Sequence, residues 1–269
     1  MHVSRFHRYD SRESIQYNTM IVQIYEIQTP LEAEQMAALG VDHIGSVLLS
    51  SDAMQNEALK ETVNVVRRLG CKSSMIPLFT NEERIAAMID YYRPDIVHFC
   101  DILPSPVTDA DALMQIVQRQ QAIRKRFSRL EIMRSIPIGC TGYGARVASL
   151  KMASVFESCS DWFLTDTLLF NGDRTKNADQ PVDGYVGITG KVCDWDVAAA
   201  LVEKSNIPVI LAGGIGPENA SAGVEKVRPA GIDSCTRTNA LDSDGKSIRF
   251  KKDVERVSRL VAAAHRAER

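Results

Sequence analysis

Residues 21–49 read IVQIYEIQTPLEAEQMAALGVDHIGSVLL and contain the first strand–helix–strand unit of the chain. Residues 21–27 are mostly apolar and rich in β-branched side chains, which is typical of a buried strand. Thr29-Pro30 supplies a helix N-cap followed by proline at the first helical position, so we predict a helix over residues 31–39. Residues 41–49 return to the strand pattern. The expected local structure is two strands joined by a helix.

This unit recurs along the chain. Strands are predicted at residues 21–27, 41–49, 74–78, 95–99, 131–136, 162–165, 208–211 and 231–234. Helices are predicted at residues 31–39, 57–69, 81–91, 109–126, 146–157, 196–204, 217–227 and 251–265. Eight such units predict an α/β protein whose parallel strands close into a single (β/α)8 TIM barrel over residues 21–269. An open doubly wound sheet is the alternative, but no GxGxxG follows the first strand.

The composition excludes several classes of protein. Hydrophobic residues make up 45% of the 269 residues, and 32 Lys and Arg against 34 Asp and Glu give a net charge of −2, as in an ordinary soluble globular protein. Without a basic excess, we expect no nucleic-acid partner. No apolar run reaches the roughly 18 residues that a membrane span needs. Residues 1–20 are polar and lack an apolar signal core, so we expect a short N-terminal extension on the surface.

The six cysteines are widely spaced and include no CxxC pair. We therefore expect reduced, mostly buried thiols and a cytoplasmic location. No cluster of His, Asp or Glu residues has the spacing of metal ligands, so neither a metal nor another cofactor is predicted.

A glycine-rich turn at residues 211–219, LAGGIGPEN, predicts a phosphate site. Gly213 and Gly214 end a strand, and a helix follows, so free backbone N–H groups point toward the space where an anion would bind. Barrels often bind phosphate between the loops after strands seven and eight. The loop after the next strand adds side chains from Ser234, Thr236 and Arg237. A tight strand exit without a ligand is the alternative.

Several residues near strand ends have side chains suited to proton transfer. Asp166 follows a buried strand and could be a general acid or base if burial raises its pKa, or a turn aspartate. His98 could transfer protons near neutral pH, or it could be a satisfied interior hydrogen-bonding group. Glu26 is an acid–base candidate, or a salt-bridged carboxylate on the rim. Cys100 and Cys235 would be nucleophiles only beside a base.

One connection is unusually long. About 20 residues without periodicity lie between Asp166 and Gly187. Loops of this length in compact domains tend to be lids, binding loops or disordered segments. Because this one follows a strand, we expect it at the face where barrel enzymes carry out their chemistry.

Four stretches resemble a known family: TPLEAEQMAALGVDHIG at residues 29–45, RPDIVHF at residues 93–99, DWFLTD at residues 161–166 with GITGKVCDW at residues 187–195, and PVILAGGIGPEN at residues 208–219. Together they resemble the phosphoribosylanthranilate isomerase family. The resemblance implies a barrel enzyme of tryptophan biosynthesis that performs an Amadori rearrangement. In this reaction an aminoaldose phosphate opens with the help of a general acid, and a general base removes the proton from C2 to give an aminoketose.

The resemblance also implies roles for individual residues. The family's acid, an aspartate that ends strand six, corresponds to Asp166. Its phosphate-binding glycines correspond to Gly213 and Gly214. Its glycine-rich loop corresponds to residues 187–190, which include Gly187, Thr189 and Gly190.

The sequence departs from the family at three places. The family's base is the cysteine of a Lys-Ile-Cys-Gly motif, and this chain has Gln23-Ile-Tyr-Glu26 there, with Tyr25 in place of the cysteine. The arginine that holds the anthranilate carboxylate is expected near Ala53, where none occurs. Arg237 stands where the family has a small glycine. We therefore expect Glu26, or else His98, to act as a substitute base.

These observations predict a phosphoribosylanthranilate-isomerase-like barrel that acts on a small phosphorylated substrate, with no nucleic-acid or membrane partner and a possible homo-oligomeric state. A different sugar-phosphate enzyme on the same scaffold, such as a lyase or epimerase, is the first alternative. A non-catalytic relative that uses the barrel for binding or assembly is the second. The aspartate and the glycine-rich loops favour an enzyme, whereas the missing cysteine favours the non-catalytic relative.

Overall fold

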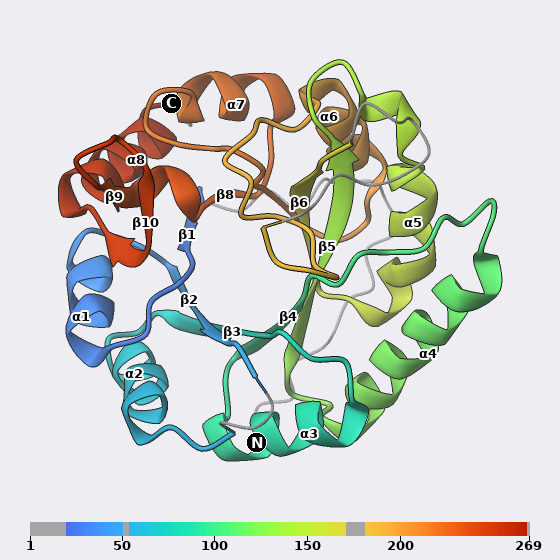
Figure 1. The fold of residues 1–269 in the computed structure, drawn as a ribbon, viewed down its shortest axis with the longest axis horizontal. Helices are drawn as coiled ribbons and strands as arrows, with labels where there is room; N and C mark the ends of the chain where they lie inside the picture. Colours follow the sequence, from blue (N-terminus) through green and yellow to red (C-terminus); the bar gives the residue numbers. More distant parts are fainter. Residues whose placement is uncertain (1–19, 51–53, 171–180, 268–269) are drawn as a thin grey trace, which may run out of the picture.

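The computed structural model describes residues 20–50, 54–170 and 181–267. All but the last residue of the predicted N-terminal extension, residues 1–20, lies outside the described residues. The barrel predicted from residue 21 onward is present and closed, with its eight parallel strands in sequence order (Figure 1). The strands are β1 (Ile21–Ile24), β2 (His43–Leu48), β3 (Lys72–Pro77), β4 (Ile96–Phe99), β5 (Glu131–Gly139), β6 (Trp162–Leu168), β7 (Val209–Leu211) and β8 (Gly231–Ser234).

Helices surround the strands in a ring (Figure 1). They are α1 (Pro30–Ala38), α2 (Glu57–Arg68), α3 (Glu82–Tyr92), α4 (Ala110–Arg126), α5 (Ser149–Phe156), α6 (Trp195–Lys204), α7 (Ala220–Val227) and α8 (Val254–Ala267). The predicted cap of the first helix is confirmed, because Thr29 Oγ1 accepts a hydrogen bond from the Glu32 backbone N–H at 3.3 Å.

Alternate residues of each strand face the helices or the barrel interior. Val22, Ile24 and Ile232 pack with buried residues of α1, α7 and α8. The barrel interior is filled by other buried side chains, among them Trp162 and Leu164. The barrel closes where β1 pairs with β8 in the register Ile24↔Ser234. Because the eight strands of this closed barrel are parallel, their carboxyl ends lie together at one rim.

One part of the fold was not predicted. A two-stranded antiparallel sheet of β9 (Asn239–Leu241) and β10 (Ser247–Lys252) stands between β8 and α8. The helix predicted from residue 251 consequently begins at Val254. The sequence pattern does not reveal this hairpin because its strands are short and mostly polar, which leaves little hydrophobic periodicity to detect.

The long connection after β6 crosses the barrel mouth in its described part, which is drawn in amber near the centre of Figure 1. The Val186 backbone N–H donates to Cys100 O at 2.9 Å, and the Ile102 N–H donates to Gly184 O at 2.9 Å, so this loop is tied to the end of β4. Residues 171–180 of the predicted loop lie outside the described residues. No helix in the described ranges is long and apolar enough to cross a membrane.

Candidate active site

A cavity lies at the rim where the barrel strands end, and the loop after β6 forms part of its wall. Of the residues predicted to form the site, Gly187 alone does not line the cavity, and it packs against the Asp166 carboxylate. The cavity is lined by Asp166, Glu26, His98, Thr189, Gly190, Gly213, Gly214, Ser234, Thr236 and Arg237. The fold therefore brings together residues that are spread over more than 200 positions of the sequence.

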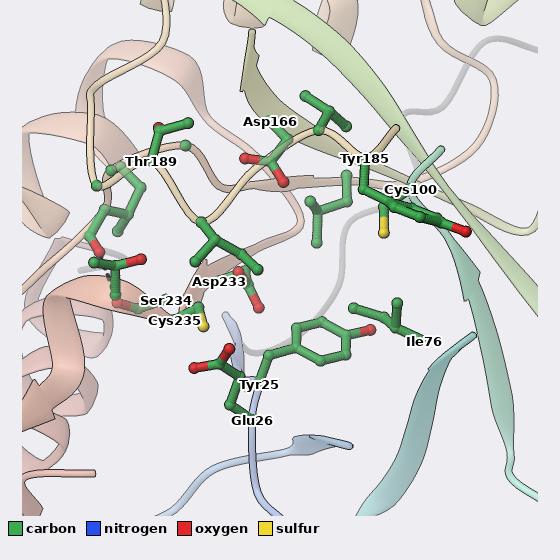
Figure 2. A pocket seen from close by; sticks show the side chains of 18 of the residues that line it. Tyr25, Glu26, Ile76, Cys100, Asp166, Tyr185, Thr189, Asp233, Ser234 and Cys235 are labelled. Carbon is green, nitrogen blue, oxygen red and sulfur yellow. Dashed lines mark hydrogen bonds between the residues drawn. The ribbon is translucent and has the colours of Figure 1, made fainter. Parts of the chain in front are cut away.

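Asp166 lies near the end of β6, and its carboxylate points into the cavity (Figure 2). Desolvation raises the pKa of Asp166 to about 7, although the hydrogen bond that Oδ1 accepts from the Thr167 N–H at 2.9 Å opposes the rise. Gly187 packs against this carboxylate with a φ of +106°, a conformation that favours glycine. With this pKa, the Asp166 carboxyl can both hold and release a proton near neutral pH.

Asp233 is a second carboxylate in the same cavity, and it is not among the residues predicted from the sequence. It lies on β8, and because its neighbour Ile232 packs toward the helices, Asp233 faces the barrel interior. Its Oδ1 accepts a hydrogen bond from Gln23 Nε2 at 3.1 Å. Burial raises the pKa of Asp233 to about 7, and the negative charge of Asp166 adds to the rise. An acidic residue on an otherwise buried strand is the sequence signal that could have identified it.

Glu26 is fully buried at the end of β1 and is held by an arginine of the unpredicted hairpin. Arg249 donates from Nε and Nη2 to Glu26 Oε1, at 2.7 and 2.5 Å. This ion pair occupies Oε1 of the Glu26 carboxylate. The structure thus places Glu26 in the alternative role, as a salt-bridged carboxylate of the rim, and its role as substitute base stays a prediction.

His98 belongs to a buried chain of hydrogen bonds with Tyr25. The Tyr25 hydroxyl lies 2.5 Å from Ser74 Oγ and 2.8 Å from His98 Nδ1, and His98 Nε2 lies 2.8 Å from Ser135 Oγ. Burial lowers the pKa of His98 to about 3, so the ring is neutral at physiological pH. Because both ring nitrogens already have partners, the geometry matches the interior hydrogen-bonding group that we considered as the alternative.

The predicted phosphate-binding residues gather where β6, β7 and β8 end. Gly213 and Gly214 have φ values of +77° and +71°, and a Cβ at position 214 would lie 2.5 Å from the Lys191 backbone, so the glycine-rich loop packs directly on this turn. Arg237 Nε donates to Gly190 O at 3.1 Å, which ties the loops after β6 and β8 together. Ser234 Oγ donates to Ile215 O at 2.7 Å and so holds the turn in place.

The two cysteines and position 53 contribute less to the site. Burial raises the pKa of the Cys235 thiol to about 12 and that of Cys100 above its usual range, so neither is a thiolate at neutral pH. Ala53, where the carboxylate-holding arginine is absent, lies outside the described residues. In the part of the chain that the structure describes, no group of His, Cys, Asp or Glu residues could hold a metal ion.

Comparisons with known proteins identify relatives of this chain. Residues 166–239 match the sequence model of a family described as N-(5'-phosphoribosyl)anthranilate (PRA) isomerase. N-(5'-phosphoribosyl)anthranilate isomerase 2 of Methanosarcina mazei is 31% identical over 147 residues, which span 55% of this chain and 53% of that protein. N-(5'-phosphoribosyl)anthranilate isomerase of Methanosarcina acetivorans is 22% identical over 245 residues, 88% of this chain and 92% of that protein.

Solved structures show the same fold. The crystal structure of phosphoribosyl anthranilate isomerase from Thermotoga maritima has a TM-score of 0.63 and 18% identity, and the match covers 91% of this chain and 98% of that one. A second structure, with a TM-score of 0.61, 17% identity and the same coverage of both chains, holds a phosphoribosyl anthranilate isomerase in complex with reduced 1-(o-carboxyphenylamino)-1-deoxyribulose 5-phosphate. The family match falls on β6 to β8, which carry Asp166 and the glycine-rich loops, and the second curated relative extends it to almost the whole barrel. Residues 166–239 of this chain thus match the phosphoribosylanthranilate isomerase family, and its barrel has the fold of solved proteins of that name.

Proposed function

We propose that this chain converts N-(5'-phosphoribosyl)anthranilate into the corresponding aminoketose by an Amadori rearrangement. The observation that carries the proposal is the position of Asp166, whose carboxylate shares one cavity with the glycine-rich loops after β6 and β7. A proton donor beside an anion site is what an aminoaldose phosphate needs for ring opening.

Asp166 is the general acid of this proposal. With a pKa of about 7, its carboxyl is protonated in roughly half of the molecules at neutral pH. It donates the proton to the ring oxygen of the ribose as the bond from that oxygen to C1 breaks. The nitrogen lone pair then forms a C1=N double bond, which leaves a protonated imine.

The phosphate is held by the glycine-rich turn and loops that border the same cavity. The turn at Gly213 and Gly214 and the loop residues Gly190 and Thr236 all border the cavity. Main-chain N–H groups in such turns favour bound anions. The Arg237 guanidinium adds a positive charge where the two loops meet. Binding of the phosphate group at these loops orients the sugar without contact with the bonds that change.

The test is turnover of N-(5'-phosphoribosyl)anthranilate by the purified protein and by D166N. Loss of a general acid is expected to lower kcat by roughly 10²- to 10⁴-fold. D196N is the matched control, because Asp196 is an exposed carboxylate of α6 paired with Lys226 at 2.6 Å, and it should keep wild-type activity. Absence of turnover by the wild-type protein would contradict the proposal.

A related sugar-phosphate lyase or epimerase is the second candidate, and the replacement of the family's cysteine by Tyr25 favours it. If the wild-type protein fails on the anthranilate substrate, other aminoaldose and ketose phosphates are the next substrates to test. Binding of a phosphorylated sugar without turnover of any of them would support the non-catalytic alternative.

We extend the proposal to assembly and location. A Thermotoga maritima relative is described as a dimeric phosphoribosylanthranilate isomerase, of which monomers were generated. A homo-oligomeric state of this chain in the cytoplasm is consistent with that description. Sedimentation velocity of the full chain tests the first part, and fractionation of cells tests the second.

A further inference from the structure

We propose that Asp233 is the general base that removes the C2 proton, in place of the cysteine that the family carries where this chain has Tyr25. This inference rests on the proposed isomerisation and assigns the one step for which the sequence pattern offers no established group. Asp233 would act as a catalytic residue, in contact with the reacting carbon.

Position 25 cannot supply the base. A Cβ built on Gly45 would lie 2.1 Å from the ring of Tyr25, so the ring is packed directly against β2. The Tyr25 hydroxyl is engaged with Ser74 and His98, and burial raises its pKa well above the usual value for a tyrosine. A neutral phenol with both hydrogen-bonding positions in use has no capacity to take a proton from carbon.

Asp233 stands beside that position and faces the cavity. Strands β1 and β8 pair in the register Gln23↔Asp233, so the carboxylate lies one step below the rim next to Tyr25. Figure 2 shows Asp233 and Asp166 directed into the same cavity, which the Tyr25 ring also lines. A substrate that receives a proton from Asp166 is therefore within reach of a second carboxylate.

The partner of Asp233 explains why this carboxylate is free to act as a base. Gln23 Nε2, which donates to Asp233, belongs to a neutral amide, whereas the family's Lys-Ile-Cys-Gly motif has a lysine at this position. An ammonium group there would stabilise the charged carboxylate and reduce its affinity for a proton. Gln23 stands in place of the family's lysine, and Tyr25 stands in place of its cysteine. The two replacements thus fit together, because the first leaves Asp233 able to act as a base and the second removes the family's base.

The other groups around Asp233 leave its carboxylate available to accept a proton. The titratable and charged groups that interact with its charge are Asp166 on β6, Tyr25 at the end of β1, Cys235 after β8 and Lys252 on β10. Arg249 is paired with Glu26, and Lys252 Nζ donates to Cys235 O at 2.9 Å and to Asn239 Oδ1. Both cations therefore have partners of their own, and the bonding partner of the Asp233 carboxylate is Gln23.

The proton transfers balance between the two carboxyls. The ionised Asp233 takes the hydrogen on C2 of the protonated imine as a proton, and the C–H electron pair becomes the C1=C2 double bond. The π electrons of C1=N move to nitrogen, which becomes a neutral amine. The enol then collapses to the ketone as Asp233 returns its proton to C1, and the C2 hydroxyl proton goes to Asp166. Both carboxyls end as they began.

The first test compares kcat and KM of the wild-type chain, D233N and D196N on N-(5'-phosphoribosyl)anthranilate. The asparagine of D233N keeps the size of the side chain and an oxygen for Gln23, but it cannot accept the C2 proton. We expect kcat to fall by roughly 10²- to 10⁴-fold while KM stays within about fivefold, and D196N to keep both values. A loss confined to KM would overturn the assignment, because it would indicate a binding role.

The second test uses Gln23 and does not depend on the folding of D233N. Q23K places an ammonium beside Asp233, so the rise of kcat with pH should shift to lower pH by about one unit or more. Q23L removes a hydrogen bond that stabilises the charged carboxylate, so the same rise should shift to higher pH. Shifts in opposite directions identify Asp233 as the group that titrates, and a purely structural role would move neither profile. Unchanged profiles in both variants would overturn the assignment.

Failure of this inference is distinguishable from failure of the proposed function. If the wild-type protein turns over the substrate and folded D233N keeps kcat within about tenfold, Asp233 is not the base and the isomerase function stands. If the wild-type protein does not turn over the substrate at all, both the isomerase function and the role of Asp233 as base are contradicted.

Discussion

Gly187 lies so close to Asp166 that a Cβ at position 187 would stand 2.2 Å from Asp166 Oδ2. The glycine-rich loop therefore closes directly over the carboxylate that we assign as the general acid. This contact contributes to the desolvation that raises the pKa of Asp166 to about 7. The loop fixes both the position of the acid and its readiness to hold a proton.

This contact predicts the result of a G187A substitution. The new methyl group must displace the Asp166 carboxylate, and the φ of +106° adds backbone strain. We expect kcat to fall by about 10- to 100-fold and the free energy of unfolding by about 1–3 kcal/mol. G184A is the matched control, since Gly184 has a φ of +77° and no atom within 4 Å of its Cβ position. It should lose stability through strain and keep kcat.

The two carboxyls predict a bell-shaped pH profile of kcat. Asp166 must be protonated and Asp233 ionised, and each has a pKa of about 7. Activity should rise with pH as Asp233 ionises and fall as Asp166 loses its proton, with a narrow maximum close to neutral pH. A plateau that extends well above about pH 9 would contradict the role of Asp166 as acid.

The raised pKa of Asp166 also predicts how the stability depends on pH. A folded pKa of about 7 exceeds the unfolded value, so the folded state is favoured below the unfolded pKa and loses this contribution as pH rises through 7. Because Asn is neutral at every pH, D166N should be more stable than the wild-type protein at about pH 8, by about 1 kcal/mol or more, and similar to it at about pH 4. Urea unfolding at both pH values measures the difference. An equal difference at both would show that its cause is not ionisation.

The pair of Glu26 and Arg249 predicts strong coupling between the two residues. R249M leaves the buried Glu26 carboxylate without its partner and should cost about 2–4 kcal/mol of unfolding free energy. The double variant E26Q/R249M should recover part of the loss, because the buried charge is gone. E26Q also tests whether Glu26 is the substitute base. If Glu26 removes the C2 proton, E26Q loses kcat by the factor expected for D233N, and otherwise its kcat stays near the wild-type value.

The position of Arg237 predicts that its side chain contributes to the affinity for the phosphate group. R237A removes both the positive charge and the hydrogen bond to Gly190 O at 3.1 Å, so KM should rise by about tenfold or more while kcat changes less. R237K keeps the charge and should recover part of the affinity. Calorimetric titration with inorganic phosphate checks the effect without turnover. Wild-type affinity in R237A would place the phosphate elsewhere.

The barrel could be predicted from the sequence because its pattern is local and repeated. Each strand and its following helix are encoded within about 30 residues, and caps such as Thr29 set the start of a helix through a neighbour three residues away. Once the strands are known to be parallel and closed, their ends must lie at one rim. This is why the order of the elements along the chain suffices to place Asp166, Gly190, Gly214 and Arg237 together.

The ionisation and pairing of these side chains depend on contacts that the local pattern does not contain. Glu26 meets Arg249 across 223 positions of the chain, through a hairpin too short and polar to predict. Gln23 meets Asp233 across 210 positions of the chain. Asp233 was not among the residues predicted from the sequence, and this contact helps make it the strongest candidate for the base. The sequence by itself therefore determined the barrel, the rim and the residues available there. The tertiary structure decided which carboxylates are paired and which are free, because a pKa depends on the groups that surround a side chain in space.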